Sequence, residues 1–485
     1  MDADATVALL DVIRALAFVG DLAMGQPTNH SLRTARIAGM LAKAANGDDV
    51  LCAETASVAL LRWSGCTANA PEFAQWFGDD IGGRNALLAL TASASGLRSG
   101  TESESTAFLS LSRIHCEASG EIAELLGLSE EAQFALRHLF ESYDGNGAPD
   151  GLGGDRVPPS VYMASLAGDL EIFSRLYGIE QACHLLKRRA DTQYPADLVA
   201  IVILHASQWL QSLDEEPSLE DACVVQAAFA GRTTSLEILA DVVDLKLPWM
   251  TGHSRRVATL ARETAINLNL DHSSQQRAYR SALIHGVGRA AVPNMIWDTP
   301  GKLQGAAWER VRLVPYWTAR AARQIGSLAA EATLASYAYE RLDGSGYYRE
   351  AEVDGMPIEA RILAAATAFS ALVAPRPWRG ALGTEEAANQ MRAEAAAGRF
   401  DMDVVRALLA DTRKGSAQSF SSGILSERER QVLHWISNGA SNKAVALKLS
   451  ISPSTVRTHV ESVFRKLGCS TRAAATLKAA QLGLL

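Results

Sequence analysis

The chain has 485 residues, of which 48% are hydrophobic, and a net charge of −8. This length predicts several domains, and the chain has enough apolar residues for sizeable cores. It has no run of eighteen apolar residues, its residues 1–4 lack the basic start of a signal peptide, and its six cysteines form no C-x-x-C pair. We therefore expect no membrane span and no disulfide framework, which fits a cytoplasmic protein.

Apolar residues recur at helical spacing through residues 1–410, for example at Leu9, Ile13, Leu16 and Ala17. Strand-like alternation is scarce, so the pattern predicts an all-α chain. The regular alternation of strands and helices that a phospho-receiver domain needs is not present.

A set of marker residues occurs twice in this region with nearly the same spacing. The first set is His30, Arg62, His115, Glu141, Asp144 and Asp169. The second set is His253, His285, Val314, Glu340, Asp343 and Thr367. The intervals are 32, 53, 26, 3 and 25 residues against 32, 29, 26, 3 and 24. This agreement predicts two copies of one helical domain.

The second interval differs between the copies because the first copy contains a Ser/Gly-rich stretch at residues 91–106, which we predict to be an inserted flexible loop. Glu-Glu-Pro-Ser at residues 215–218 marks a junction. We predict domains at residues 1–212 and 213–411, a linker at 412–422 and a final domain at 423–485.

Each copy resembles the HD-GYP domain, an all-helical family of metal-dependent phosphodiesterases. In the second copy, ERLDGSGY at residues 340–347 resembles H-H-E-x-x-D-G-x-G-Y, and RPWR at 376–379 resembles R-P-Y-R. ALIHGVG at 282–288 stands at the family's His-Asp helix, and RILAAAT at 361–367 stands at the helix that ends in Asp. In the first copy, ESYDGNGAP at 141–149 fills the same role as residues 340–347.

The resemblance implies seven metal-ligand positions in each copy, most of which are replaced here. The second copy keeps His253 and His285, and its other positions are Gly286, Val314, Ala338, Tyr339 and Thr367. The first copy keeps His30, His115 and Asp169, and its other positions are Arg62, Trp63, Leu139 and Phe140. Two imidazoles without a carboxylate cannot build a two-metal centre, so we expect no catalytic activity and no cofactor. A single metal held by the three residues of the first copy remains an open alternative.

The replacements in the second copy exchange charged groups for small or apolar ones, and aromatic residues are frequent nearby. We therefore predict a pocket for a small-molecule effector of apolar or aromatic character. Its expected lining residues are His253, His285, Val314, Tyr339 and Thr367. The alternative is that larger side chains fill the space. The Asp-Gly-x-Gly segments are good turn formers and need no ligand to explain them.

The last 63 residues carry start signals for three short helices. Ser426 and Glu429 form an S-x-x-E capping box, Ser441 can cap a second helix, and Ser452 followed by Pro453 can begin a third. The third helix would bury Val456, Val460, Val463, Phe464 and Leu467 and expose Ser454, Arg457, Thr458, Glu461 and Arg465. This arrangement predicts a helix-turn-helix with an outward polar and basic face.

Charge and motifs agree with this interpretation. Residues 423–485 hold nine Lys and Arg against three Glu, a net charge of +6, so the rest of the chain carries −14. A basic module suits phosphate attraction. LSERE at 425–429, GASNK at 439–443, STVRTHV at 454–460 and KLG at 466–468 resemble the DNA-binding domain of LuxR-type transcriptional regulators. The resemblance implies a fourth helix near residues 471–480 that often mediates dimerisation.

We therefore expect a transcriptional regulator that binds double-stranded DNA as a homodimer and makes no membrane contact. By the resemblance, Ser454, Thr455 and Arg457 would face base edges. Phosphate contacts would come from Lys443, Thr458, His459, Arg465 and Lys466. Two alternatives remain open: a residual metal-dependent phosphohydrolase in the first copy, and a protein-interaction scaffold that controls the helix-turn-helix.

Overall fold

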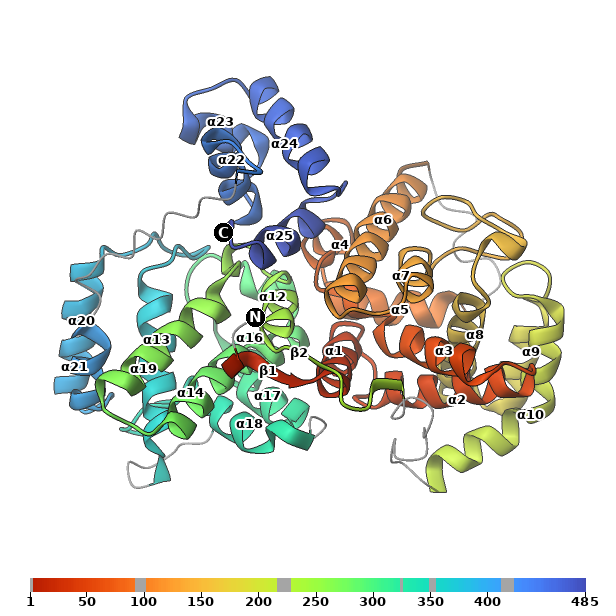
Figure 1. Cartoon of the computed structure of the whole chain (residues 1–485), viewed down its shortest axis with the longest axis horizontal. Coiled ribbons are helices and arrows are strands. Elements are labelled where there is room, and N and C mark those ends of the chain that lie inside the picture. The colour runs from red at the N-terminus through yellow and green to blue at the C-terminus, as the bar shows by residue number, and fades with distance from the viewer. Residues whose placement is uncertain (1–2, 92–101, 216–227, 323–325, 349–354, 411–422) are drawn as a thin grey trace. The chain divides into compact units, whose positions relative to one another are not determined.

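The computed structural model describes residues 3–91, 102–215, 228–322, 326–348, 355–410 and 423–485 (Figure 1). They are helical apart from irregular segments and a two-stranded sheet formed by β1 (Thr6–Ala8) and β2 (Thr233–Ser235). The contacts divide the chain into two compact units, Ala8–Thr233 and Met1–Val7 with Thr234–Leu485. The all-α prediction is confirmed.

The first repeat is a helical unit built around α2, α3 and α8, which pack on one another. Its helices are α1 (Leu9–Ala23), α2 (His30–Ala44), α3 (Asp49–Leu61), α4 (Ala70–Phe77), α5 (Asp80–Thr91), α6 (Glu102–Leu125), α7 (Glu130–Arg137), α8 (Pro159–Tyr177), α9 (Ile179–Lys187) and α10 (Ala196–Glu215). Short 3₁₀ turns η2 (Ser64–Cys66) and η3 (Gly154–Arg156) connect them.

The second repeat has the same order of helices around α13, α14 and α19. Its helices are α12 (Glu237–Asp244), α13 (His253–Asn267), α14 (His272–Ile284), α15 (Asn294–Trp297), α16 (Gly305–Arg312), α17 (Val314–Ala322), α18 (Ala329–Ala335), α19 (Ile358–Leu372), α20 (Thr384–Ala396) and α21 (Met402–Ala410). Its 3₁₀ turns are η5 (Pro248–Met250), η6 (Val287–Ala291) and η7 (Gly326–Leu328), and η1 (Ala3–Ala5) belongs to the same unit.

Equivalent helices confirm the internal repeat. α2 and α13 begin at the marker residues His30 and His253 and are both 15 residues long, while α3 and α14 are both 13 residues long. Of the predicted inserted loop, residues 92–101 lie outside the described residues, whereas Glu102 already begins α6. Residues 216–218 of the predicted junction and the predicted linker 412–422 also lie outside them.

One described helix is long and apolar enough, by length and composition alone, to cross a membrane: the part of α10 from Ala196 to Asp214. The helix packs against α9, α2 and α8. These contacts cover part of its apolar surface, and 39% of the apolar segment is buried inside the first repeat.

The C-terminal module, drawn in blue in Figure 1, consists of α22 (Glu427–Ser437), α23 (Asn442–Leu449), α24 (Pro453–Leu467) and α25 (Arg472–Gln481). The predicted caps are confirmed, because Ser426, Ser441 and Ser452 each accept a backbone N–H of the helix that they precede. The core includes Leu425, Val432, Leu433, Ile436, Val445, Val456, Val460, Val463 and Leu467. The predicted fourth helix is α25, which Thr471 caps.

Candidate functional site

One buried carboxylate, that of Glu429, links the first and third helices of the C-terminal module. Oε2 of Glu429 accepts the backbone N–H of Ser426 at 2.7 Å, completing the predicted capping box. The same carboxylate accepts hydrogen bonds from Lys466 Nζ at 2.6 Å and Ser462 Oγ at 2.7 Å, which fixes α22 to α24. Burial acts to raise the pKa of Glu429, but these donors outweigh it and lower the pKa to about 2. Lys466, which we predicted to contact phosphate, therefore also links α24 to α22.

The outward face of α24 carries the other predicted DNA contacts. Its exposed side chains include Ser454, Thr455, Arg457, Thr458, Glu461 and Arg465. Arg457 Nε donates to Glu461 Oε1 at 2.9 Å, and both side chains are mostly exposed. Lys443 is exposed at the start of α23, and His459 is half-buried. This basic face can approach a DNA groove, since no described side chain of α24 other than Glu461 is acidic.

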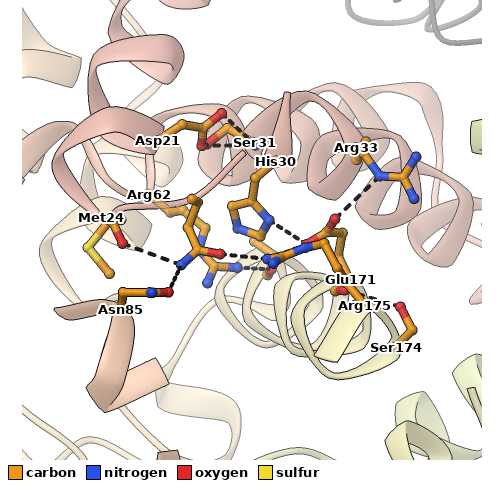
Figure 2. Close-up of polar contacts among 12 residues, drawn as sticks. Asp21, Met24, His30, Ser31, Arg33, Arg62, Asn85, Glu171, Ser174 and Arg175 are labelled. Atoms are coloured by element: carbon orange, nitrogen blue, oxygen red, sulfur yellow. Dashed lines mark hydrogen bonds and ion pairs between the residues drawn. The ribbon is translucent and has the colours of Figure 1, made fainter. Parts of the chain in front are cut away.

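In the first repeat, α1, α2 and α8 bring buried polar side chains together (Figure 2). Asp21 on α1 accepts hydrogen bonds from the backbone N of Ser31 at 3.1 Å and from its Oγ at 2.6 Å. His30 lies 2.6 Å through Nδ1 from Oε2 of Glu171 on α8. Burial lowers the pKa of His30, so its neutral ring donates to Glu171. Burial raises the pKa of Asp21 to about 8.

Arg62 stands where the family resemblance implies a His, and its side chain is buried beside these groups (Figure 2). Its Nη1 donates to the carbonyl of Ala164 at 3.2 Å, and its guanidinium carbon lies 4.1 Å from the centre of the Trp63 ring. A Cβ added to Gly168 would come 1.4 Å from Nη1. Burial lowers the pKa of Arg62, and the charge of Asp169 opposes this effect most strongly. A fixed cation therefore lies among the predicted metal ligands.

The three candidate metal ligands of the first repeat are engaged with separate partners. His30 pairs with a carboxylate, as described above. Asp169 accepts hydrogen bonds from Tyr194 at 2.6 Å and from Arg189, while His115 Nε2 lies 2.8 Å from a backbone carbonyl oxygen at the end of α3. Among the described residues, no group of three or more His, Cys, Asp or Glu is placed to hold a metal ion. These residues do not fit the metal centre that the family resemblance implies.

The second repeat also contains a buried guanidinium, supplied by a different position. Arg289 in η6 is 2% exposed, and its Nη1 lies 3.0 Å from Oδ1 of Asp244. Its Nη2 donates to Nε2 of His285 at 2.7 Å, while Nδ1 of that ring donates to the carbonyl of Ala282 at 2.5 Å. Burial, together with the charge of Arg289, lowers the pKa of His285 to about 3. The ring is therefore a neutral acceptor for the guanidinium.

The five predicted pocket-lining residues of the second repeat are His253, His285, Val314, Tyr339 and Thr367. The His253 and His285 rings lie 5.6 Å apart, and Tyr339 OH lies 3.3 Å from Nη2 of Arg289. Tyr339 stacks on Tyr347 at 4.9 Å and packs against the cluster that contains Val314. These contacts favour the alternative that the sequence left open, in which side chains occupy the space, and the predicted pocket stays a prediction. Thr367 is buried there as well.

A pair of aspartates was missed by our sequence interpretation. Asp21 and Asp244 hold equivalent places, since each accepts backbone and hydroxyl hydrogen bonds from the serine ten residues later, Ser31 or Ser254. Each aspartate also precedes the first histidine of the next helix by nine residues. That shared interval is the signal that could have identified them. The repeated intervals do not identify the buried arginine of either repeat, because Arg62 and Arg289 occupy different positions in the two copies.

The two Asp-Gly-x-Gly turns have a structural explanation. Glu141 and Glu340 each accept a backbone N–H of the following turn, at 2.7 and 3.0 Å. A Cβ at Gly147 or Gly346 would come within 2.4 or 2.3 Å of the corresponding glutamate. Glycine is needed for this close approach, as expected for a turn.

Comparison with known proteins agrees with this architecture. Residues 237–404 match the family model of the HD domain, and residues 423–479 match that of bacterial regulatory proteins of the luxR family. The 3'3'-cGAMP-specific phosphodiesterase 3 of Vibrio cholerae is 26% identical over 413 residues, which cover 79% of this chain and 90% of that protein. The probable transcriptional regulatory protein NarL of Mycobacterium tuberculosis is 50% identical over 62 residues, which cover 13% of this chain and 29% of that protein.

A crystal structure of a cyclic GMP-AMP specific phosphodiesterase of V. cholerae has a TM-score of 0.59 to this chain at 22% identity. The match covers 84% of this chain and 98% of that one, so both repeats share its helical fold. The chain therefore contains an HD domain at residues 237–404 and a C-terminal helix-turn-helix domain of the luxR family at residues 423–479.

Proposed function

We propose that this chain is a DNA-binding transcriptional regulator whose two HD-GYP-like repeats lack phosphodiesterase activity and serve as its regulatory module. The observation that carries the proposal is the buried guanidinium in each repeat, Arg62 or Arg289, beside the positions of the family's metal ligands. In the second repeat, Arg289 pairs with the carboxylate of Asp244 and donates to the Nε2 lone pair of His285, which a divalent metal would need. In the first repeat, the buried charge of Arg62 disfavours a second cation at the same place. This supports a structural role for the retained histidines.

DNA binding is assigned to α24, and the proposed target is a pseudo-palindromic site bound by a homodimer. The assay is a gel-shift titration against sites selected from a random duplex library. Arg457→Ala is expected to weaken specific binding by about 1–3 kcal/mol and to relax one base position. Arg406→Ala on α21, an exposed arginine paired with Asp403, is the matched control and should leave binding unchanged. Equal affinities of the two variants would refute the assignment.

The input to the regulator would act through the repeats, where we retain a small-molecule effector as the proposed ligand. Because Arg289 contacts both His285 Nε2 and the Tyr339 hydroxyl, an effector that binds to His285 Nε2 must displace the Arg289 side chain. A ligand specific for the native state raises the thermal midpoint in proportion to its saturation. Screening candidate effectors against wild type and Tyr339→Ala would locate the site, since a ligand bound elsewhere stabilises both equally.

A phosphohydrolase is the second candidate function, favoured by the similarity along 90% of the V. cholerae phosphodiesterase. The test is hydrolysis of 3'3'-cGAMP by the intact chain with Mn²⁺ or Fe²⁺ added. Our proposal expects no product above the protein-free blank. Turnover that disappears in His30→Ala or Asp169→Ala would favour the enzyme.

A further inference from the structure

The outward face of the recognition helix contains one acidic residue. Residues 423–485 hold three glutamates: Glu429 is bound inside the module, and Glu427 pairs with Arg430 on α22. Glu461 alone projects from α24, and its side chain is 63% exposed. A carboxylate on this face opposes the attraction between a basic helix and the phosphate backbone. A contribution of Glu461 to DNA recognition would offset this unfavourable charge.

The geometry of its ion pair points to that role. Glu461 follows Arg457 by one helical turn, so the two side chains lie on the same side of α24. The contact at 2.9 Å joins Glu461 Oε1 to Nε of Arg457 and not to either terminal nitrogen. In the described part of the chain, no other hydrogen bond or ion pair of the Arg457 guanidinium is present. The donors on Nη1 and Nη2 are therefore free of other hydrogen bonds in this part of the chain, on a side chain that is 77% exposed.

The edge formed by Nη1 and Nη2 can make the bidentate contact by which arginine reads guanine. A bidentate contact to O6 and N7 of guanine in the major groove takes two N–H donors from one side of the planar guanidinium. Arginine has many rotamers, and holding Nε restricts the orientation of the plane before DNA arrives. The carboxylate also cancels the charge of Arg457 when the helix meets DNA of the wrong sequence, which weakens non-specific attraction.

We propose that Glu461 is a positioning residue that fixes the Arg457 guanidinium for a guanine contact and thereby sets sequence specificity. This inference rests on the proposed DNA binding by α24. It predicts two opposite effects of removing the side chain. Binding to the selected site loses guanine preference at one base pair, while binding to unrelated DNA becomes stronger.

The experiment uses the full-length chain, with its preferred duplex selected from a random library. Competition binding then compares this duplex, single-base variants of it and an unrelated duplex of equal length. For Glu461→Ala, the preference for guanine at the Arg457 position should fall about fivefold or more, and affinity for the unrelated duplex should rise. Glu461→Gln keeps an acceptor for Nε but not the charge, so it should retain guanine preference while non-specific affinity rises.

Glu427→Gln is the matched control, because it removes the same charge from an exposed ion pair on α22 and should preserve guanine preference. The inference is overturned if Glu461→Ala keeps the guanine preference of wild type, or if Glu461→Gln loses as much of it as Glu461→Ala. Failure of wild type to select any duplex would instead contradict the proposed function itself. Unchanged thermal midpoints would exclude misfolding as the cause of any loss.

Discussion

Arg289→Met is the substitution that probes the buried cation of the second repeat most sharply. Methionine keeps an unbranched, flexible side chain, although a shorter one, and removes the charge and every N–H donor. Asp244, which is 2% exposed, would then lose the Arg289 nitrogen that lies 3.0 Å from its carboxylate. The buried His285 would lose the Arg289 nitrogen that lies 2.7 Å from its Nε2. Removing one partner of a buried ion pair typically costs about 3–5 kcal/mol, because the other charge stays buried and uncompensated.

The loss of stability caused by Arg289→Met should depend on pH in a defined direction. Burial already raises the pKa of Asp244 in the wild type, and loss of the Arg289 charge should raise it further. A carboxyl group whose pKa is higher in the folded state stabilises the protein most when it is protonated, and this contribution is lost as pH rises through the folded pKa. The destabilisation by Arg289→Met should therefore shrink as pH falls from neutral towards about 4.

The measurement is the thermal midpoint of the full chain across this pH range. Arg289→Met should lower the midpoint by roughly 6 °C or more at neutral pH. Arg406→Met, which removes a surface pair whose side chains are 71% and 77% exposed, should cost about 0–1 kcal/mol. Adding Asp244→Asn to Arg289→Met should recover part of the loss, since no buried charge then remains. Equal effects of the two single substitutions would refute the assignment of a buried ion pair.

Two further predictions follow from close packing and capping. Gly168→Ala should destabilise the chain by about 1–3 kcal/mol in a thermal melt, because its Cβ would displace the Arg62 guanidinium, whereas Gly39→Ala on α2 has open space and should be neutral or stabilising. Glu429→Ala should destabilise the C-terminal module by about 1 kcal/mol or more through the lost cap and the freed Lys466. Because the pKa of Glu429 is lowered to about 2, that deficit should be full above its ordinary pKa and shrink as pH falls towards 2.

The C-terminal module was predictable almost residue by residue because its signals are local. Ser426, Ser441 and Ser452 cap the helices that their positions in the sequence indicate, since a capping side chain bonds within its own first turn. The repeat was visible for a similar reason: equal intervals between marker residues correspond to helices of equal length. The contact between Lys466 and Glu429 was not predictable in the same way, because the two residues lie on different helices.

The interiors of the two repeats were less accessible to sequence reasoning. Arginine is usually exposed, so neither Arg62 nor Arg289 suggests a buried cation by its position. Arg62 reaches the site from the place of a lost histidine, whereas Arg289 reaches it from four residues beyond His285. The burial of Arg62 becomes evident only from its packing against α8, and that of Arg289 only from the position of η6 in the core. The predicted pocket depended on the assumption that the replaced side chains left a vacant space, and the sequence could not show that Arg289 reaches His285.

Metal content after reconstitution tests the central claim most directly. The intact chain would be incubated with excess Fe²⁺, Mn²⁺ or Zn²⁺, desalted, and measured by plasma mass spectrometry alongside the His30→Ala and His253→Ala variants. If guanidinium groups replace the metals, wild type should retain far less than one equivalent of any metal and should match both variants. Stoichiometric metal in wild type that is lost in either variant would contradict the account.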